Sequence, residues 1–236
     1  MNTIIEKVRA ELKRNADEKT KNTGQNYFKE KIRSHGVRAA VVNRMSKDFF
    51  KTMEDPSKAT VFNLCEELWK SGYIEESIIA CNWSWYAHRN YQPEDFVVFE
   101  RWVNEYVDNW ASCDTLCSHT IGGFLEMYPD HVVRLKDWAR SDNRWMCRAA
   151  AVSLILPARH GKFLKDMLEI ADILLLHQED LVQKGYGWML KVASQAYQHE
   201  VFEYVMKKKE VMPRTALRYA IEKMPPELRA RAMARN

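Results

Sequence analysis

An almost continuous helical pattern of apolar residues most limits the fold of this 236-residue chain. Apolar residues recur every three to four positions, the spacing that buries one face of an α-helix. Signals for β-strands are scarce, since the sequence lacks Asn-Gly and Asp-Gly hairpin turns and alternating β-branched runs. We therefore predict an all-α protein. The expected helices cover residues 3–14, 22–35, 38–53, 57–70, 74–89, 94–107, 112–127, 130–140, 143–156, 162–176, 179–197, 199–209, 213–223 and 225–235.

Three prolines mark a spacing of nearly constant length. Pro56, Pro93 and Pro129 lie 37 and 36 residues apart, and each is expected in the first turn of a helix. This spacing is close to the length of a two-helix HEAT-type unit. Gly36 and Gly72 stand where glycines that end helices are expected. Many short helices joined by tight turns favour an α-solenoid of HEAT-like repeats over a four-helix bundle.

The chain is long enough for one core or one continuous stack of repeats. No low-complexity segment or linker interrupts it, so we expect a single domain spanning residues 1–236. The first residues lack the apolar run of a signal peptide, and no stretch approaches the ~20 apolar residues of a membrane span. Five cysteines without a scaffold spacing indicate a reducing environment. These features predict a soluble, cytoplasmic protein without a membrane partner, and we expect a monomer.

Charge is distributed unevenly along a chain whose net charge is only +4. Residues 94–108 hold five acids against Arg101 alone, whereas residues 205–236 hold nine bases against three acids. A one-sided basic field of this kind suits a polyanion such as nucleic acid. The alternative is a solvated face without a specific partner.

Trp110 and Asp114 form the first candidate site. Residues four positions apart lie on one face of a helix. A carboxylate that is held in place and remains ionised stabilises positive charge on a sugar and orients a water molecule. The alternative is structural: Trp110 packs in a core, and Asp114 interacts with the positive end of the helix dipole.

Arg148 and Arg144 lie on one face of a later helix. Trp145, Ala149 and Val152 form the expected apolar stripe of that helix, with Arg148 at its edge. A guanidinium in this place suits a phosphate, which its planar fork of donors matches. The alternative is an arginine that covers apolar surface with its stem and keeps its charge in water.

Trp188 lies between Lys184 and Lys191 on a third helix. An aromatic ring beside two lysines suits a nucleic-acid surface. Gly185 and Gly187 flank Trp188, and each is unfavourable by ~1 kcal/mol inside a helix. Their presence predicts a close approach of this backbone to a neighbouring helix or to a ligand.

No metal or cofactor site is predicted. Cys113, Cys117, His119 and Cys147 lack the compact Cys-x-x-Cys spacing of zinc sites, and buried thiols are the favoured interpretation. The sequence also lacks a glycine-rich phosphate loop, a metalloprotease helix motif and a nucleophile elbow.

Three segments resemble the AlkD family of bacterial DNA alkylation repair glycosylases. They are residues 109–117 (NWASCDTLC), 141–150 (SDNRWMCRAA) and 184–191 (KGYGWMLK), and the resemblance extends from about Tyr27 to the C-terminal basic helices. It implies HEAT-like repeats that form a C-shaped molecule with a basic concave face for duplex DNA. It also implies excision of cationic bases such as 7-methylguanine and 3-methyladenine without flipping the base into a pocket.

The resemblance assigns roles to particular residues. Trp110 and Trp188 match the family's site tryptophans, and Asp114 matches its catalytic aspartate. Tyr27 matches a site tyrosine, and Arg148 matches a motif arginine. The expected DNA-binding residues are Tyr27, Arg148, Arg144, Lys184 and Lys191. Departures from the family pattern are Asn109 in place of an aromatic residue, Ala111 in place of an acid and Lys191 in place of an arginine.

The leading hypothesis is therefore a monofunctional DNA glycosylase of base excision repair that hydrolyses the N-glycosidic bond of N3- and N7-alkylpurines in duplex DNA. Two alternatives stay open. One is a non-catalytic helical-repeat module that binds distorted or branched DNA. The other is a scaffold for an acidic protein partner.

Overall fold

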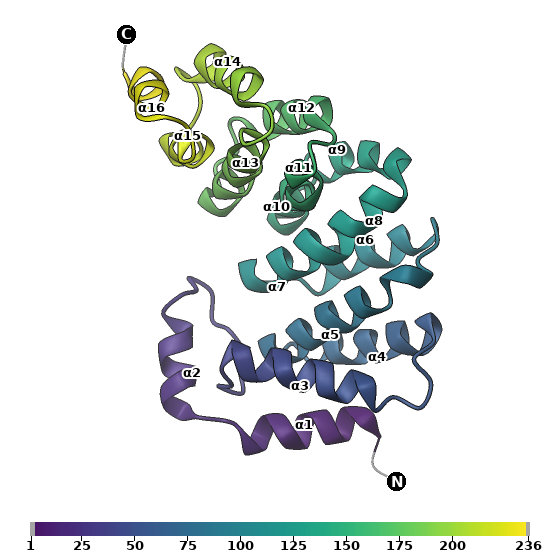
Figure 1. Cartoon of the computed structure of the whole chain (residues 1–236). Coiled ribbons are helices and arrows are strands. Elements are labelled where there is room, and N and C mark those ends of the chain that lie inside the picture. Colours follow the sequence, from purple (N-terminus) through teal and green to yellow (C-terminus); the bar gives the residue numbers. More distant parts are fainter. Residues whose placement is uncertain (1–2, 235–236) are drawn as a thin grey trace. The chain divides into compact units, whose positions relative to one another are not determined.

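A computed structural model describes residues 3–234 as a succession of helices without a strand (Figure 1). The chain forms two compact units, Met1–Leu116 and Cys117–Asn236. The predicted all-α class is confirmed, and short helices joined by tight turns are compatible with a helical-repeat solenoid. The single domain, the C shape and the basic concave face stay predictions. Among residues 3–234, no helix has the length and apolar composition needed to cross a membrane.

The first unit is built around helix α5. Its elements are α1 (Ile4–Arg14), α2 (Glu18–Gln25), α3 (Ala39–Lys51), α4 (Lys58–Lys70), α5 (Ile74–Tyr86), the short 3-10 helix η1 (His88–Asn90), α6 (Asp95–Glu105) and α7 (Trp110–Thr115). Helices α3, α4 and α7 all pack on α5. Buried aromatic side chains, among them Trp83, Phe99 and Trp102, fill the core. Burial of such large side chains is the main stabilising term of this unit.

The second unit is built around helix α13. Its elements are the π-helical stretch η2 (Leu116–Ile121), α8 (Gly122–Met127), η3 (Pro129–Val133), α9 (Arg134–Trp138), α10 (Arg144–Val152), α11 (Ile155–Arg159), α12 (Leu164–Leu174), α13 (Asp180–Ala193), α14 (Gln198–Lys208), α15 (Arg214–Ile221) and α16 (Pro226–Met233). Helix α13 packs against α10, α11, α12 and α15. It therefore holds most of this unit together.

Most predicted helices are confirmed, because their apolar stripes are local features of the sequence. Gly72 has a φ of 69° directly after α4, as expected of a glycine that ends a helix. Pro129 begins η3, whereas Pro56 and Pro93 precede the capping residues of α4 and α6 instead of lying in their first turns. The predicted end of the last helix at residue 235 lies outside the described residues.

The predicted helix 22–35 is wrong. Helix α2 ends at Gln25, and residues 26–38 are not helical. Their backbone groups bond to side chains instead: Ile32 N–H donates to Gln25 Oε1 (2.9 Å), and His35 N–H donates to Glu75 Oε2 (2.9 Å). Gly36 accordingly ends no helix, although its φ of 84° does require a glycine.

Candidate functional site

Helix α7 presents Trp110 and Asp114 one turn apart, as predicted. The helix begins at Trp110 because the Asn109 side chain caps it, accepting a hydrogen bond from Ser112 N–H at 2.9 Å. Trp110 and Asp114 are both half-buried. The π-helical stretch η2 starts two residues after Asp114, and π-helical turns frequently accompany functional sites. One short helix thus carries an aromatic ring and a carboxylate one turn apart, both partly exposed.

Buried serines hold this short helix on α5. Ser112 Oγ lies 2.8 Å from Ser77 Oγ and accepts a hydrogen bond from Asn109 Nδ2 at 2.9 Å. Asn109 and Ser112 are both buried. Asn109, which departs from the family pattern, therefore serves as the cap that fixes where Trp110 begins the helix. The Asn-x-x-Ser spacing is a local signal that sequence reasoning did not use.

Tyr27 lies beside Trp110. The indole Nε1–H of Trp110 donates to the Tyr27 carbonyl oxygen at 3.2 Å. The neighbouring Phe28 ring stacks on the Trp110 ring, with centroids 5.2 Å apart and planes 21° from parallel. The Tyr27 side chain itself is 72% exposed. The first unit thus brings Tyr27, Trp110 and Asp114 together, with Phe28 as a contact that the sequence did not predict.

Arg148 is buried, so its predicted place at the edge of an apolar stripe is wrong. The whole of α10 from Trp145 to Val152 is covered, and Arg148 is 5% exposed. Its guanidinium Nη1 donates to the carbonyl oxygen of Leu181 in the first turn of α13. A Cβ at Gly185 would lie 3.3 Å from Arg148 Cγ. Gly185 therefore makes room for the arginine that joins α10 to α13.

The three other predicted cations are each paired with a carboxylate of the second unit. Arg144 Nη1 lies 3.4 Å from Glu179, and its guanidinium carbon lies 4.8 Å from the centroid of the Trp145 ring. Lys184 pairs with Asp180 at 3.1 Å. Lys191 Nζ lies 3.0 Å from a carboxylate oxygen of Glu222 and 5.5 Å from the Tyr219 ring centroid. Partly exposed ion pairs of this kind contribute little to stability.

Trp188 is half-buried on α13, between Lys184 and Lys191. Gly187 beside it allows the close contact of α13 with α15. A Cβ at Gly187 would lie 2.7 Å from Tyr219 Cβ and 2.8 Å from the Ala216 carbonyl oxygen. The predicted close approach is therefore confirmed for both glycines, and in each case a neighbouring helix fills the space.

Exposed positive charge gathers on the last three helices. Lys207 of α14, Arg214 and Arg218 of α15, Lys223 and the two arginines of α16 are exposed. The two arginines are Arg229 and Arg231. Lys208 instead pairs with Asp172 at 2.7 Å. Exposed acids lie among these cations: Glu200, Glu203, Glu210, Glu222 and Glu227.

The cysteines that the sequence placed near the site are buried. Cys113, Cys117 and Cys147 all lie in the core, whereas His119 is exposed. Among the described residues, no three His, Cys, Asp or Glu side chains lie close enough together to hold a metal ion. Burial raises the pKa of the Cys147 thiol, which keeps it protonated at neutral pH.

Comparison with known proteins adds two findings. A family model described as DNA alkylation repair enzyme matches residues 8–224. The fold is similar to a solved structure described as a predicted DNA alkylation repair enzyme from Enterococcus faecalis, with a TM-score of 0.78 and 17% sequence identity. That similarity covers 89% of this chain and 97% of the other. No curated protein sequence matches this chain significantly.

Proposed function

The chain belongs to the family of DNA alkylation repair enzymes, and from this premise we propose that it is a monofunctional glycosylase for cationic N3- and N7-alkylpurines in duplex DNA. The observation that carries the proposal is the pairing of Trp110 with Asp114 on α7. An aromatic face and a carboxylate one turn apart are what a cationic sugar needs beside it. The substrates are DNA lesions such as 7-methylguanine and 3-methyladenine, and the pathway is base excision repair.

The chemistry of the lesion determines what the enzyme has to supply. Alkylation at N3 or N7 places a positive charge on the purine, so the base leaves without a general acid. As the bond to the base breaks, the deoxyribose gains oxocarbenium character. Asp114 stabilises that charge through space and positions the water that attacks the sugar. The Trp110 face favours the same cation through its quadrupole.

This chemistry needs no pocket for an extruded base. The charge to be stabilised lies on the sugar, which is reached from the backbone side of the duplex. We therefore propose excision without base flipping, in contrast to most enzymes that act on bases. The exposed Tyr27 ring is the proposed contact with the DNA backbone beside Trp110.

The second unit carries the other residues that we propose bind DNA. Trp188 contacts a deoxyribose, while Lys184 and Lys191 on the same helix exchange their carboxylate partners for phosphates. Arg144 does the same on α10. Arg148 holds α13 and so supports this surface, and a phosphate contact is the second role that the resemblance implies for it.

A non-catalytic DNA-binding module is the second candidate. The exposed cations of α14–α16 favour it, because a phosphate surface of this kind requires no Asp114. Release of 7-methylguanine from methylated duplex DNA separates the two candidates. The protein should free the alkylated base and leave undamaged DNA intact. Tight duplex binding without release of any base would establish the non-catalytic module instead.

A further inference from the structure

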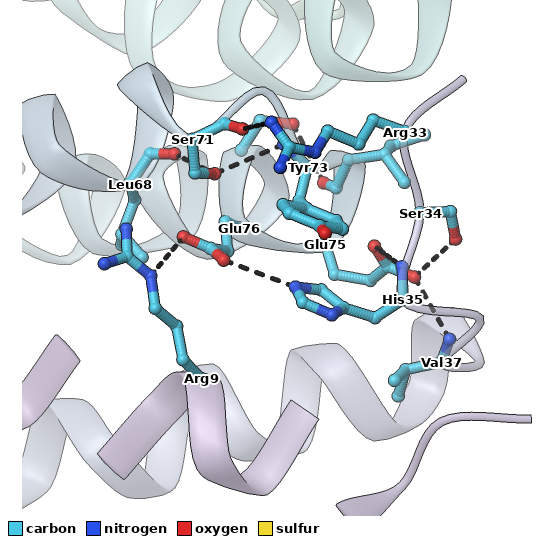
Figure 2. Close-up of polar contacts among 12 residues, drawn as sticks. Arg9, Arg33, Ser34, His35, Val37, Leu68, Ser71, Tyr73, Glu75 and Glu76 are labelled. Atoms are coloured by element: carbon cyan, nitrogen blue, oxygen red, sulfur yellow. Dashed lines mark hydrogen bonds and ion pairs between the residues drawn. The ribbon is translucent and has the colours of Figure 1, made fainter. Parts of the chain in front are cut away.

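Glu75 in the first turn of α5 binds a segment that lies 40 residues earlier in the chain. Its carboxylate accepts hydrogen bonds from the backbone N–H groups of His35 (2.9 Å), Gly36 (2.9 Å) and Val37 (3.1 Å). The Ser34 hydroxyl donates to it at 2.7 Å. Glu75 is 4% exposed, and a carboxylate this buried requires such a set of donors (Figure 2).

Glu76, the next residue, holds the same segment through its side chain. His35 Nε2 lies 3.3 Å from Glu76 Oε1, and Arg9 Nε of α1 donates to Glu76 Oε2 at 3.0 Å. The His35 ring stacks on Tyr73 with centroids 3.8 Å apart, and Figure 2 shows the Tyr73 ring between Arg33 and His35. Burial alone would raise the pKa of Glu76, but the hydrogen bonds from His35 and Arg9 outweigh it and lower the pKa.

Little apolar burial holds the segment. Within residues 26–38, only Gly36 and Val37 are buried. The backbone of a non-helical segment must find partners outside itself, and here Glu75 supplies them for three consecutive amides. The two glutamates therefore hold residues 34–37 by directional bonds, and the Gln25 side chain of α2 holds Glu30 and Ile32 on the way to the other end of the segment.

The other end of this segment reaches the candidate site. Phe28 stacks on Trp110, and the Tyr27 carbonyl accepts the hydrogen bond of the Trp110 indole. Ser77, which follows the two glutamates on α5, meets Ser112 of α7. Three consecutive residues of α5 thus contact both structures that surround Trp110: the segment on one side and α7 on the other.

We propose that Glu75 and Glu76 are positioning residues, which hold residues 26–38 so that Phe28 and the Tyr27 carbonyl fix the Trp110 ring beside Asp114. This inference rests on the proposed function, because it assigns the effect to base excision. Misplacement by about 1 Å reduces an enzymatic rate by as much as ~10²-fold without removing any reacting group. Loss of the Glu75 carboxylate should therefore slow the chemical step more than it weakens binding.

The test compares Glu75→Gln with Glu66→Gln under single-turnover conditions. Glu66 is a matched control, because it is also a carboxylate of the first unit that accepts four close hydrogen bonds. It lies on α4, its donors lie on or directly after α6, and none belongs to residues 26–38. Glu75→Gln should excise 7-methylguanine about 10- to 100-fold more slowly, with duplex affinity unchanged within about twofold. Glu66→Gln should keep the parent rate. Excision by Glu75→Gln at the parent rate would overturn the proposal, and so would an equal loss in both variants.

Two further variants keep the proposal testable if Glu75→Gln does not fold. Ser34→Ala removes one donor of Glu75 and should slow excision about fivefold, the equivalent of one hydrogen bond. Phe28→Leu removes the stack on Trp110. Because both substitutions act on the same segment, the excision rate of the double variant should fall by less than the product of the two single fold-losses. A double variant whose rate loss equals the product of the two single losses would contradict the proposal, and so would excision by Ser34→Ala at the parent rate.

A measurement without substrate separates this inference from the proposed function. Amide hydrogen exchange at His35, Gly36 and Val37 should accelerate in Glu75→Gln, or in Ser34→Ala to a smaller degree, beyond any change at the other amides of the first unit. In Glu66→Gln these three amides should change no more than the rest of the first unit. If Glu75→Gln leaves exchange at these amides unchanged, Glu75 does not hold the segment, whatever the excision rate. If the parent protein releases no alkylated base, the proposed function is wrong. Hydrogen exchange at residues 35–37 then still tests whether Glu75 holds the segment.

Discussion

Replacing Glu66 by glutamine should destabilise the first unit at neutral pH and much less in acid. Glu66 of α4 accepts hydrogen bonds from both terminal nitrogens of Arg101, at 2.5 and 2.9 Å. It also accepts them from Trp102 Nε1 at 2.7 Å and from the Tyr106 hydroxyl at 2.6 Å. A glutamine keeps the shape but loses the charge, and it cannot accept at both ends. The substitution therefore breaks the bidentate pair that joins α4 to α6.

The magnitude follows from the pKa of this carboxyl group. Burial alone would raise the pKa of Glu66, but the hydrogen bonds from Arg101, Tyr106 and Trp102 outweigh it and lower the pKa from 4.5 to about 2. Each pKa unit corresponds to about 1.4 kcal/mol, which gives about 3 kcal/mol for the full shift. The Glu66 side chain is 17% exposed, so solvent screening reduces the expected contribution to about 2 kcal/mol.

The sign of the pH dependence is fixed by the direction of the shift. The folded pKa lies below the unfolded one, so the stabilisation is complete above the unfolded value of 4.5 and disappears as pH falls toward about 2. About half of it should be lost between about pH 5 and pH 3.

Urea unfolding of the parent and Glu66→Gln proteins at several pH values measures this directly, with Glu105→Gln as an exposed control on α6. The free-energy difference should shrink as the solution is acidified. The same difference at neutral pH and at about pH 3 would refute the assigned role of the ionised carboxylate.

Three more predictions concern the second unit and its DNA surface. Gly187→Ala should lower the free energy of unfolding by about 1–2 kcal/mol. The new Cβ overlaps Tyr219 and Ala216, and the cost of this overlap exceeds the gain from the higher helix propensity of alanine. Unchanged urea denaturation would contradict this. Arg148→Ala should destabilise the protein by about 2–3 kcal/mol, because it removes the donor to Leu181 and leaves a cavity. If the variant keeps the parent Tm but loses DNA binding, Arg148 acts only as a DNA ligand. Duplex affinity should fall steeply with salt, with a log–log slope of about −0.9 for each phosphate contact, and a flat titration would exclude both DNA-binding functions.

Local patterns in the sequence predicted most helices and the placing of two candidate site residues on one helix. The i, i+4 spacing placed Trp110 and Asp114 together, and α7 confirms that geometry. Glycines beside Trp188 predicted a close backbone approach, which the contact with α15 confirms. Such features depend on a few neighbouring residues, so one sequence is enough to recognise them.

The errors concern contacts between distant residues. The predicted helix 22–35 ends at Gln25, and Glu75, far along the chain, accepts the amides of His35, Gly36 and Val37. Arg148 is buried instead of peripheral because Gly185 on another helix leaves space for it. The stack of Phe28 on Trp110 was missed for the same reason, since only the path of the non-helical segment brings the two rings together. No local periodicity contains this information.

The most direct test of the proposed function is the single-turnover release of 7-methylguanine from one defined duplex by the parent and by Asp114→Asn. Asparagine keeps the size of the side chain and removes its charge, so any loss reports electrostatic stabilisation of the sugar cation. The variant should be about 10²–10³-fold slower, with duplex affinity equal to that of the parent or slightly higher. A folded Asp114→Asn protein that releases the base at the parent rate would remove Asp114 from the mechanism.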